Sequence, residues 1–175
     1  MTAPRPVEPV WRESWRTDPA VRPVADRHYN RQHIGAQNFV PPGRCLVLSA
    51  CHGVAFWVTS WPFAEYVRHA WAGAWVCSAF RRESGPWLAS DMIRAAVAAT
   101  RAKWPMTPDL GMITFVDERH VRRKRDAGRC YLKAGFKRVG ETKGGLVALQ
   151  LMPSDMPPAF AALPINESLF SGGTP

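Results

Sequence analysis

Residues 74–116 read AWVCSAFRRESGPWLASDMIRAAVAATRAKWPMTPDLGMITFV, and this stretch indicates the class of fold. The first nine residues, 74–82, are apolar with a polar end and predict a strand. Ala89–Lys103 has apolar residues at helical spacing and predicts a helix. GMITFV, at residues 111–116, predicts a short buried strand. A strand followed by a helix and a second strand predicts a mixed α/β sheet covered by helices.

The apolar spacing predicts which side chains share a face. Along the first strand we expect Trp75, Cys77 and Ala79 on one face, and Val76, Ser78 and Phe80 on the other. In the helix, Ser90 is a favourable N-cap, and Trp104-Pro105 ends the helix because the residue before a proline disfavours helical backbone. The apolar stripe of this helix consists of Leu88, Met92, Ala96 and Ala99.

The residues on either side add further elements. RCLVLSA (Arg44–Ala50) and GVAFWVTSW (residues 53–61) are apolar runs separated by a short turn, so they predict a hairpin. A short helix is predicted over residues 128–134, because glycine is common just past a helix end and Gly135 follows. Residues 139–140 and 146–152 predict a closing strand or hairpin. The predicted α/β domain therefore covers residues 24–152.

Prolines interrupt both ends of the chain. Residues 1–23 form a proline-rich arm, and residues 153–175 form an irregular tail without Lys or Arg. Proline restricts φ and removes a backbone donor, so we expect neither end to contain a long helix or a central strand. Trp11 and Trp15 are one helical turn apart and are predicted to pin the arm onto the core.

The composition limits the function. The 175 residues include 23 Lys and Arg against 14 Asp and Glu, which gives a formal net charge of +9. A hydrophobic content of 46% excludes a mostly disordered chain. No apolar run approaches the ~18–20 residues of a membrane span, and the N-terminus has no signal-peptide core. We therefore expect a soluble, cytoplasmic protein without a membrane partner, whose charge favours nucleic acid.

Most of the excess charge lies in one window. Residues 119–143 contain ten Lys and Arg against Asp126 and Glu141, and five of the seven residues at 119–125 are basic. A solvated loop is one interpretation of such a run. We favour phosphate binding, either to a nucleic-acid backbone or to a nucleotide cofactor. The predicted DNA-binding residues are Arg119, Arg122, Arg123, Lys124 and Arg125.

Two short polar segments are candidates for chemistry. Asp26-Arg27-His28-Tyr29 precedes the first core strand, and His28 has the side chain that titrates nearest neutrality. Tyr29 can donate a proton or stack on a base, although an ordinary exposed loop also explains the segment. Asp117 directly follows the strand at 111–116, where carboxylates often belong to a site. A carboxylate that caps a turn is the alternative for Asp117.

Other residues have a possible role at a phosphate or a metal. Ser90 can present its hydroxyl and nearby N–H groups to a phosphate, and plain N-capping explains it equally well. Arg81 ends a central strand and faces either a ligand or solvent. The sequence contains enough nitrogen and oxygen ligands for a non-haem metal site, for which two His and a carboxylate are the usual minimum: His28, His33, His52, His120 and Asp117. Of these, His28 and Asp117 are the predicted metal ligands. Only general ligand chemistry supports this site, since no metal-binding spacing motif is present.

Several motifs are absent. The four cysteines include no C-x-x-C pair, so thiolate zinc and thioredoxin-like sites are not supported, and buried reduced thiols are expected. Neither a P-loop nor a G-x-G-x-x-G fingerprint is present, which leaves nucleotide triphosphatase and Rossmann assignments without support.

The segment GRCYLKAGF at residues 128–136, followed by KRVG, resembles the last conserved segment of the GNAT acyltransferases. The resemblance implies a GNAT-like, mostly antiparallel central sheet flanked by helices. It departs from the family at residues 82–90, RESGPWLAS, where GNAT proteins have a Gly-rich loop for the acyl-CoA pyrophosphate. This departure argues against ordinary acyl-CoA binding.

A longer resemblance is to the Mom DNA-modification proteins of phages, a divergent GNAT-like family. The similar stretches are ADRHY at 25–29, FVPPGRCLVL at 39–48, AWAGAW at 70–75 running on to Phe80-Arg81, and FVD at 115–117 through the basic run to Phe136. The resemblance implies conversion of adenine in double-stranded DNA to N6-carbamoyl-methyladenine, which protects phage DNA from restriction. It also implies bound iron. By position, its functional residues are His28, Tyr29, Arg81, Ser90, Asp117 and Tyr131.

This activity has a chemical requirement that the candidates meet. The N6 amine of adenine loses a proton as it is substituted, so His28 or Asp117 is expected to act as a base. Because N6 lies inside a duplex, the adenine is expected to flip out and to stack on Tyr29 or a tryptophan. Two alternatives stay open: an ordinary N-acetyltransferase that uses acetyl-CoA on a small-molecule or protein amine, and a non-catalytic DNA-binding module.

Overall fold

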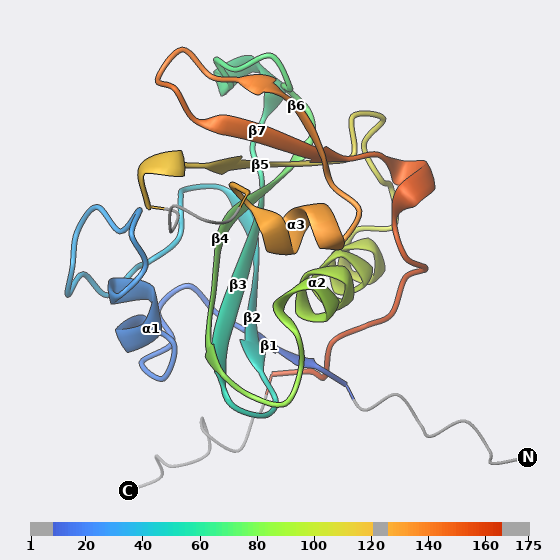
Figure 1. Cartoon of the computed structure of the whole chain (residues 1–175). Coiled ribbons are helices and arrows are strands. Elements are labelled where there is room, and N and C mark those ends of the chain that lie inside the picture. The colour runs from blue at the N-terminus through green and yellow to red at the C-terminus, as the bar shows by residue number, and fades with distance from the viewer. Residues whose placement is uncertain (1–8, 121–125, 166–175) are drawn as a thin grey trace, which may run out of the picture.

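The computed structural model describes residues 9–120 and 126–165 of the chain. Its strands are β1 (Trp11–Ser14), β2 (Arg44–Ala50), β3 (Val54–Trp61), β4 (Trp75–Ser84), β5 (Met112–Val116), β6 (Lys137–Glu141) and β7 (Val147–Leu151). They form one seven-stranded sheet in the order β1-β2-β3-β4-β5-β7-β6 (Figure 1). Every neighbouring pair is antiparallel except β4 and β5. The predicted α/β class and mostly antiparallel sheet are confirmed.

Helices lie on both faces of the sheet. Helices α2 (Ala89–Lys103) and α3 (Arg129–Lys133) pack on the face that carries Trp57 and Trp75. Helix α1 (Arg22–Asp26) packs on the opposite face, against Phe56. Single 3-10 turns occur as η1 (Ala64–Tyr66), η2 (Glu118–His120) and η3 (Pro153–Asp155). Within the described ranges, none of the helices has the length and apolar character needed to cross a membrane.

The start of helix α2 differs from the prediction. The helix covers the predicted residues, but its N-cap is Leu88, with φ −67° and ψ 147° and no capping side chain. An N-cap residue has non-helical backbone, whereas Ser90 lies inside the first helical turn. The prediction that Ser90 is the N-cap is therefore wrong.

The N-terminal arm joins the sheet as edge strand β1. Trp11 is 1% exposed, and its indole Nε1 donates to the Met92 carbonyl in α2 at 2.9 Å. Leu163 from the C-terminal end pairs with β1, since its N–H donates to the Trp11 carbonyl at 3.0 Å. Trp11 therefore enters the core from a strand. Its spacing of one helical turn from Trp15 does not determine its position, because Trp11–Ser14 is a strand.

A bulge in β4 reverses the predicted faces of that strand. Thr59 pairs with Cys77 and Val58 pairs with Ala79, so Ser78 is an extra residue on β4. Before the bulge, Cys77 packs in the core under α2; after it, Phe80 packs on that same side, while Ala79 contacts the opposite core. The prediction that places Ala79 with Cys77, and Phe80 on the other face, is wrong because of this bulge.

Strands β4 and β5 pair over only three residues each. The parallel ladder runs from Trp75 to Cys77 on β4 and from Met112 to Thr114 on β5. Beyond these residues the two strands part, as Figure 1 shows. The gap that opens in the sheet lies beside the Ser78 bulge, and the candidate site lies there.

Candidate active site

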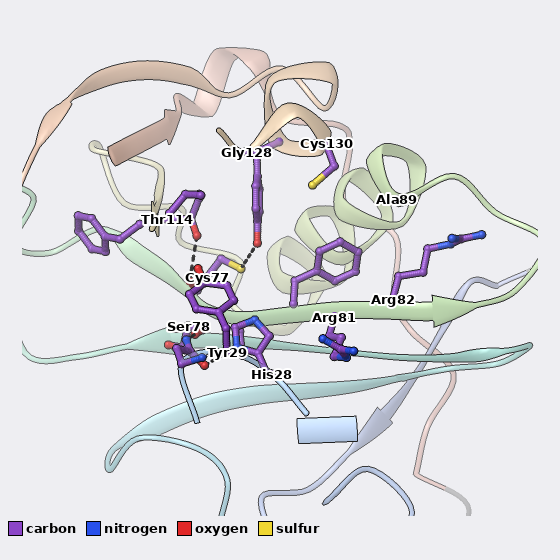
Figure 2. Close-up of a pocket in the computed structure, with 16 residues that line it drawn as sticks. His28, Tyr29, Cys77, Ser78, Arg81, Arg82, Ala89, Thr114, Gly128 and Cys130 are labelled. Carbon is purple, nitrogen blue, oxygen red and sulfur yellow. Dashed lines mark hydrogen bonds between the residues drawn. The ribbon is translucent and has the colours of Figure 1, made fainter. Parts of the chain in front are cut away.

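A cavity of about 340 Å³ lies where β4 and β5 part, between the end of α1 and the start of α3 (Figure 2). His28, Tyr29, Arg81 and Tyr131 all line it. These four predicted site residues come from three separate parts of the chain. In Figure 2, His28 and Tyr29 lie beside Ser78, with Gly128 and Cys130 across the cavity from them. The tertiary structure thus brings together residues that the sequence places about a hundred positions apart.

Asn30 orients the ring of His28. The Asn30 side-chain amide nitrogen donates to the Ser78 carbonyl at 3.1 Å, and its Oδ1 is hydrogen-bonded to Nδ1 of His28. Because the Ser78 carbonyl only accepts, the amide oxygen must be the group that faces the imidazole. This anchoring sets the orientation of the imidazole, and the Asn30 backbone N–H also approaches Nδ1, at 3.3 Å.

The surroundings of His28 keep it neutral. Its side chain is buried, at 9% exposure. Burial lowers the pKa of His28 below its ordinary 6.5, and the nearby charge of Arg81 acts in the same direction. The hydrogen bonds to Asn30 and to the Phe80 backbone favour the charged ring and oppose this shift only in part. At neutral pH His28 is thus a neutral acceptor of protons.

Tyr29 stacks between two histidines. Its ring centroid lies 4.7 Å from that of His28 and 4.9 Å from that of His120, and both ring pairs are nearly parallel. Burial raises the pKa of the Tyr29 hydroxyl, so this group stays protonated. The stack connects the buried base to the 3-10 turn η2, where the basic segment begins.

Asp117 caps that turn. Its carboxylate accepts hydrogen bonds from the Arg119 backbone N–H at 3.0 Å and from the Arg119 guanidinium at 2.7–3.2 Å. The guanidinium hydrogen bonds lower the pKa of Asp117 to about 2, and His120 Nε2 lies 3.7 Å from Oδ2. The geometry of Asp117 is therefore that of a carboxylate that caps a turn. A carboxylate with a pKa of about 2 is too weak a base to take a proton from the N6 amine of an adenine.

Tyr131 and Cys77 meet at the α3 side of the cavity. The Tyr131 hydroxyl and the Cys77 Sγ are 3.5 Å apart, and Thr114 Oγ1 donates to the Cys77 carbonyl at 3.2 Å. Burial raises the pKa of the Cys77 thiol to about 12 and the pKa of Tyr131 well above its ordinary value. Cys77 is therefore not a thiolate nucleophile at neutral pH, and Tyr131 remains a hydrogen-bond donor.

The remaining predicted residues lie around this cavity or outside the described chain. Ser90 lines a separate cavity of about 440 Å³ at the start of α2, together with Arg129 and Lys133. Arg119 contacts Asp117, and its side chain is otherwise 80% exposed. Asp117 lines a neighbouring cavity of about 320 Å³, together with Tyr29, Asn30 and His120. Arg122, Arg123, Lys124 and Arg125 lie outside the described residues.

Comparison of the chain with family models, curated proteins and solved structures finds no match.

The described residues do not provide the ligand set expected for iron. No group of three or more His, Cys, Asp or Glu side chains converges within residues 9–120 and 126–165. The predicted ligands His28 and Asp117 are on different sides of Tyr29, since the Tyr29 ring is stacked between His28 and His120 and the latter is the histidine near Asp117.

Sequence reasoning missed Asn30, Ser78 and His120. An Asn two residues after a His is a local hydrogen-bonding pattern, so Asn30 had a detectable signal. The bulge at Ser78 had none, because it depends on the pairing of β4 with β3. His120 was considered only as a metal ligand, and its stacking on Tyr29 requires the turn that Asp117 caps.

Proposed function

We propose that this protein is a DNA-modifying transferase that converts adenine in double-stranded DNA to the N6-carbamoylmethyl derivative and so protects phage DNA from restriction in the host cytoplasm. One observation carries the proposal: a buried, neutral His28 lines the same cavity as Tyr29, Arg81 and Tyr131. Arg119, where the basic segment of the sequence begins, contacts Asp117, and Asp117 lines a cavity of about 320 Å³ together with Tyr29 and Asn30 of this site. A GNAT-like fold is part of the proposal, and the mixed sheet with helices on both faces supports it.

The chemistry follows from the weak nucleophilicity of N6, whose lone pair is delocalised into the adenine ring. In the proposed reaction, N6 bonds to the methylene carbon of a carbamoylmethyl donor, and the leaving group departs with the bonding electron pair. The N6 proton passes to the unprotonated ring nitrogen of neutral His28. Asp117, with its pKa held at about 2 by Arg119, instead holds the turn at the start of the basic segment. Tyr131 stays protonated and is available as a donor to a developing negative charge.

The first prediction tests this role of His28. Plasmid is co-expressed with the protein, digested to nucleosides and examined by mass spectrometry, with restriction resistance as a second measure. Wild type is expected to yield the modified deoxyadenosine, and His28→Ala to lower its yield at least about 100-fold, the usual contribution of a general base. His52→Ala is the matched control, because His52 is exposed and lines none of the cavities described above. Unmodified deoxyadenosine from a folded wild-type protein would overturn the proposal.

An ordinary N-acetyltransferase is the second candidate, and one observation favours it. The cavity at the start of α2 contains Arg129 and Lys133 beside helix N–H groups that have no capping side chain. Such groups suit a phosphate. Tight acetyl-CoA binding by calorimetry, with acetyl transfer that needs no DNA, would select this candidate. DNA binding by both wild type and His28→Ala, with no product from either protein, would select the non-catalytic module.

A further inference from the structure

A second cavity, of about 470 Å³, lies on the α1 side of β4. Residues 30–33, 38 and 40–42 form its outer wall, and its floor consists of Phe39 and of residues from β3 and β4. It shares His28, Asn30, Ser78 and Ala79 with the first cavity, so these residues form a wall between the two. We propose that this second cavity binds the extruded adenine. His28 then stands between the acceptor base and the donor cavity. The inference rests on the proposed function.

The floor of the second cavity suits a flat aromatic ring. Phe39, Phe56 and Val58 line it and are 9%, 1% and 0% exposed, respectively. Phe39 packs edge-on against Phe56, with centroids 6.1 Å apart, so both rings are held in place. Pockets for flipped bases combine such apolar walls with a few polar groups that read the base edge.

The outer wall is held in a preformed shape although it is neither helix nor strand. Arg31 donates from Nε to Asp26 at 2.9 Å and from its terminal nitrogens to the carbonyls of Ala36 and Asn38, at 2.7 and 3.2 Å. Asp26 also accepts from the Gly35 N–H at 3.2 Å. A loop that is ordered before binding loses little conformational freedom when the ligand enters. The ion pair with Asp26 thus keeps the cavity open for a base.

Gln32 is the side chain best suited to recognise the base edge. It lines the second cavity, is exposed, and forms no hydrogen bond within the described part of the chain. Its amide offers a donor and an acceptor side by side, the arrangement that pairs with the N6 and N7 edge of adenine. Asn30 cannot serve in this way, because both ends of its amide are already engaged by Ser78 and His28.

The second prediction fills the cavity from its rim. Gln32→Trp places an indole in the proposed base position, and Gln37→Trp is its control in the same loop, since Gln37 is exposed and lines neither cavity. Gln32→Trp is expected to lower modified deoxyadenosine in co-expressed plasmid at least about tenfold, a loss that corresponds to 1.4 kcal/mol. Gln37→Trp is expected to remain within about twofold of wild type, and both variants to bind plasmid as wild type does. Undiminished modification by Gln32→Trp would overturn the inference.

Direct binding separates this inference from the proposed function. Wild type, Gln32→Trp and Gln32→Ala are titrated with deoxyadenosine monophosphate and followed by backbone amide NMR. We expect saturable shifts in residues 30–42, absent in Gln32→Trp and requiring about fivefold more ligand in Gln32→Ala, as for one lost hydrogen bond. If wild-type protein modifies no DNA but shows these shifts, the proposed function fails and the base site stands. If the signals of residues 30–42 do not shift in wild type, the proposed base site is wrong. If Gln32→Trp does not fold, the comparison of Gln32→Ala with wild type tests the site instead.

Discussion

At the scale of single residues, the chemistry of His28 comes from its neighbours. Burial lowers its pKa, and Asn30, which is anchored on the Ser78 carbonyl, orients its ring. Asp117, the other predicted base, sits beside Arg119 and is ionised down to a pH of about 2. His28 and Asp117 are both candidate bases in the sequence, but their surroundings shift their pKa values differently. Only His28 can take up a proton near neutral pH.

The third prediction concerns Asn30 as a positioning residue. Activity depends on neutral His28, so kcat/KM is expected to be level at higher pH and to fall as pH drops through a pKa below 6.5. The Asn30 hydrogen bond raises that pKa, so Asn30→Leu is expected to move the acid limb to lower pH and to reduce kcat about tenfold or more. Asn30→Asp adds a negative charge and is expected to move the limb to higher pH. Identical pH profiles in all three proteins would show that Asn30 does not act through His28.

At the scale of elements, helix α2 holds the sheet and the N-terminal arm together. Met92 is fully buried beneath the sheet, and its carbonyl accepts the Trp11 indole hydrogen bond from β1. The helix formed where its apolar spacing predicted, because this side of the sheet offers a continuous apolar surface that includes Trp57 and Trp75. Strand β4 differs from its prediction, because the bulge at Ser78 interrupts the alternation of its side chains between the two faces of the sheet.

The fourth prediction measures this anchoring. Met92→Ala leaves a cavity in the core and is expected to lower the free energy of unfolding by about 2–5 kcal/mol. Met106→Ala, at a side chain that is 82% exposed, is expected to change it by less than about 0.5 kcal/mol. Chemical denaturation measures both values from the midpoint at constant slope. Equal effects of the two substitutions would contradict the assignment of Met92 to the core.

At the scale of the whole molecule, charge and cavities occupy the same region. Asp117, which accepts hydrogen bonds from Arg119, lines a cavity of about 320 Å³ together with Tyr29 and His120. His120 stacks on Tyr29, which in turn stacks on His28. Arg81 and Arg82 line the first cavity, so a polyanion that contacts them would lie next to His28.

The fifth prediction concerns the salt dependence of DNA binding. Each phosphate contact contributes about −0.9 to the slope of log affinity against log salt concentration. Arg122→Gln with Arg123→Gln is expected to reduce the magnitude of that slope by about 2. The control pair, Arg22→Gln with Arg68→Gln, removes the same charge at residues that form no ion pair in the described chain. Fluorescence anisotropy at several salt concentrations gives the slope for each double variant. If both double variants reduce the slope equally, the effect comes from the total charge and not from the basic segment.

The sequence by itself determined the elements and the class of the fold. The strand Arg44–Ala50 and the helix Ala89–Lys103 coincide with the predicted ranges, and the other core elements agree within a few residues. These features are local, because the spacing of apolar residues along the chain sets which backbone period can bury them. The sequence did not predict edge strand β1 or helix α1, so the position of His28 and Tyr29 just after a helix came only from the structure.

Only the tertiary structure decided which residues share the site. The Ser78 bulge arises from pairing with β3, and the site opens because β4 and β5 stop pairing after Cys77. The contacts that separate His28 from Asp117, and that leave His28 between two cavities, join residues far apart in the chain. The apolar pattern of one segment does not determine how two distant strands pair. The geometry of His28 and its cavities therefore appears only once the sheet is assembled.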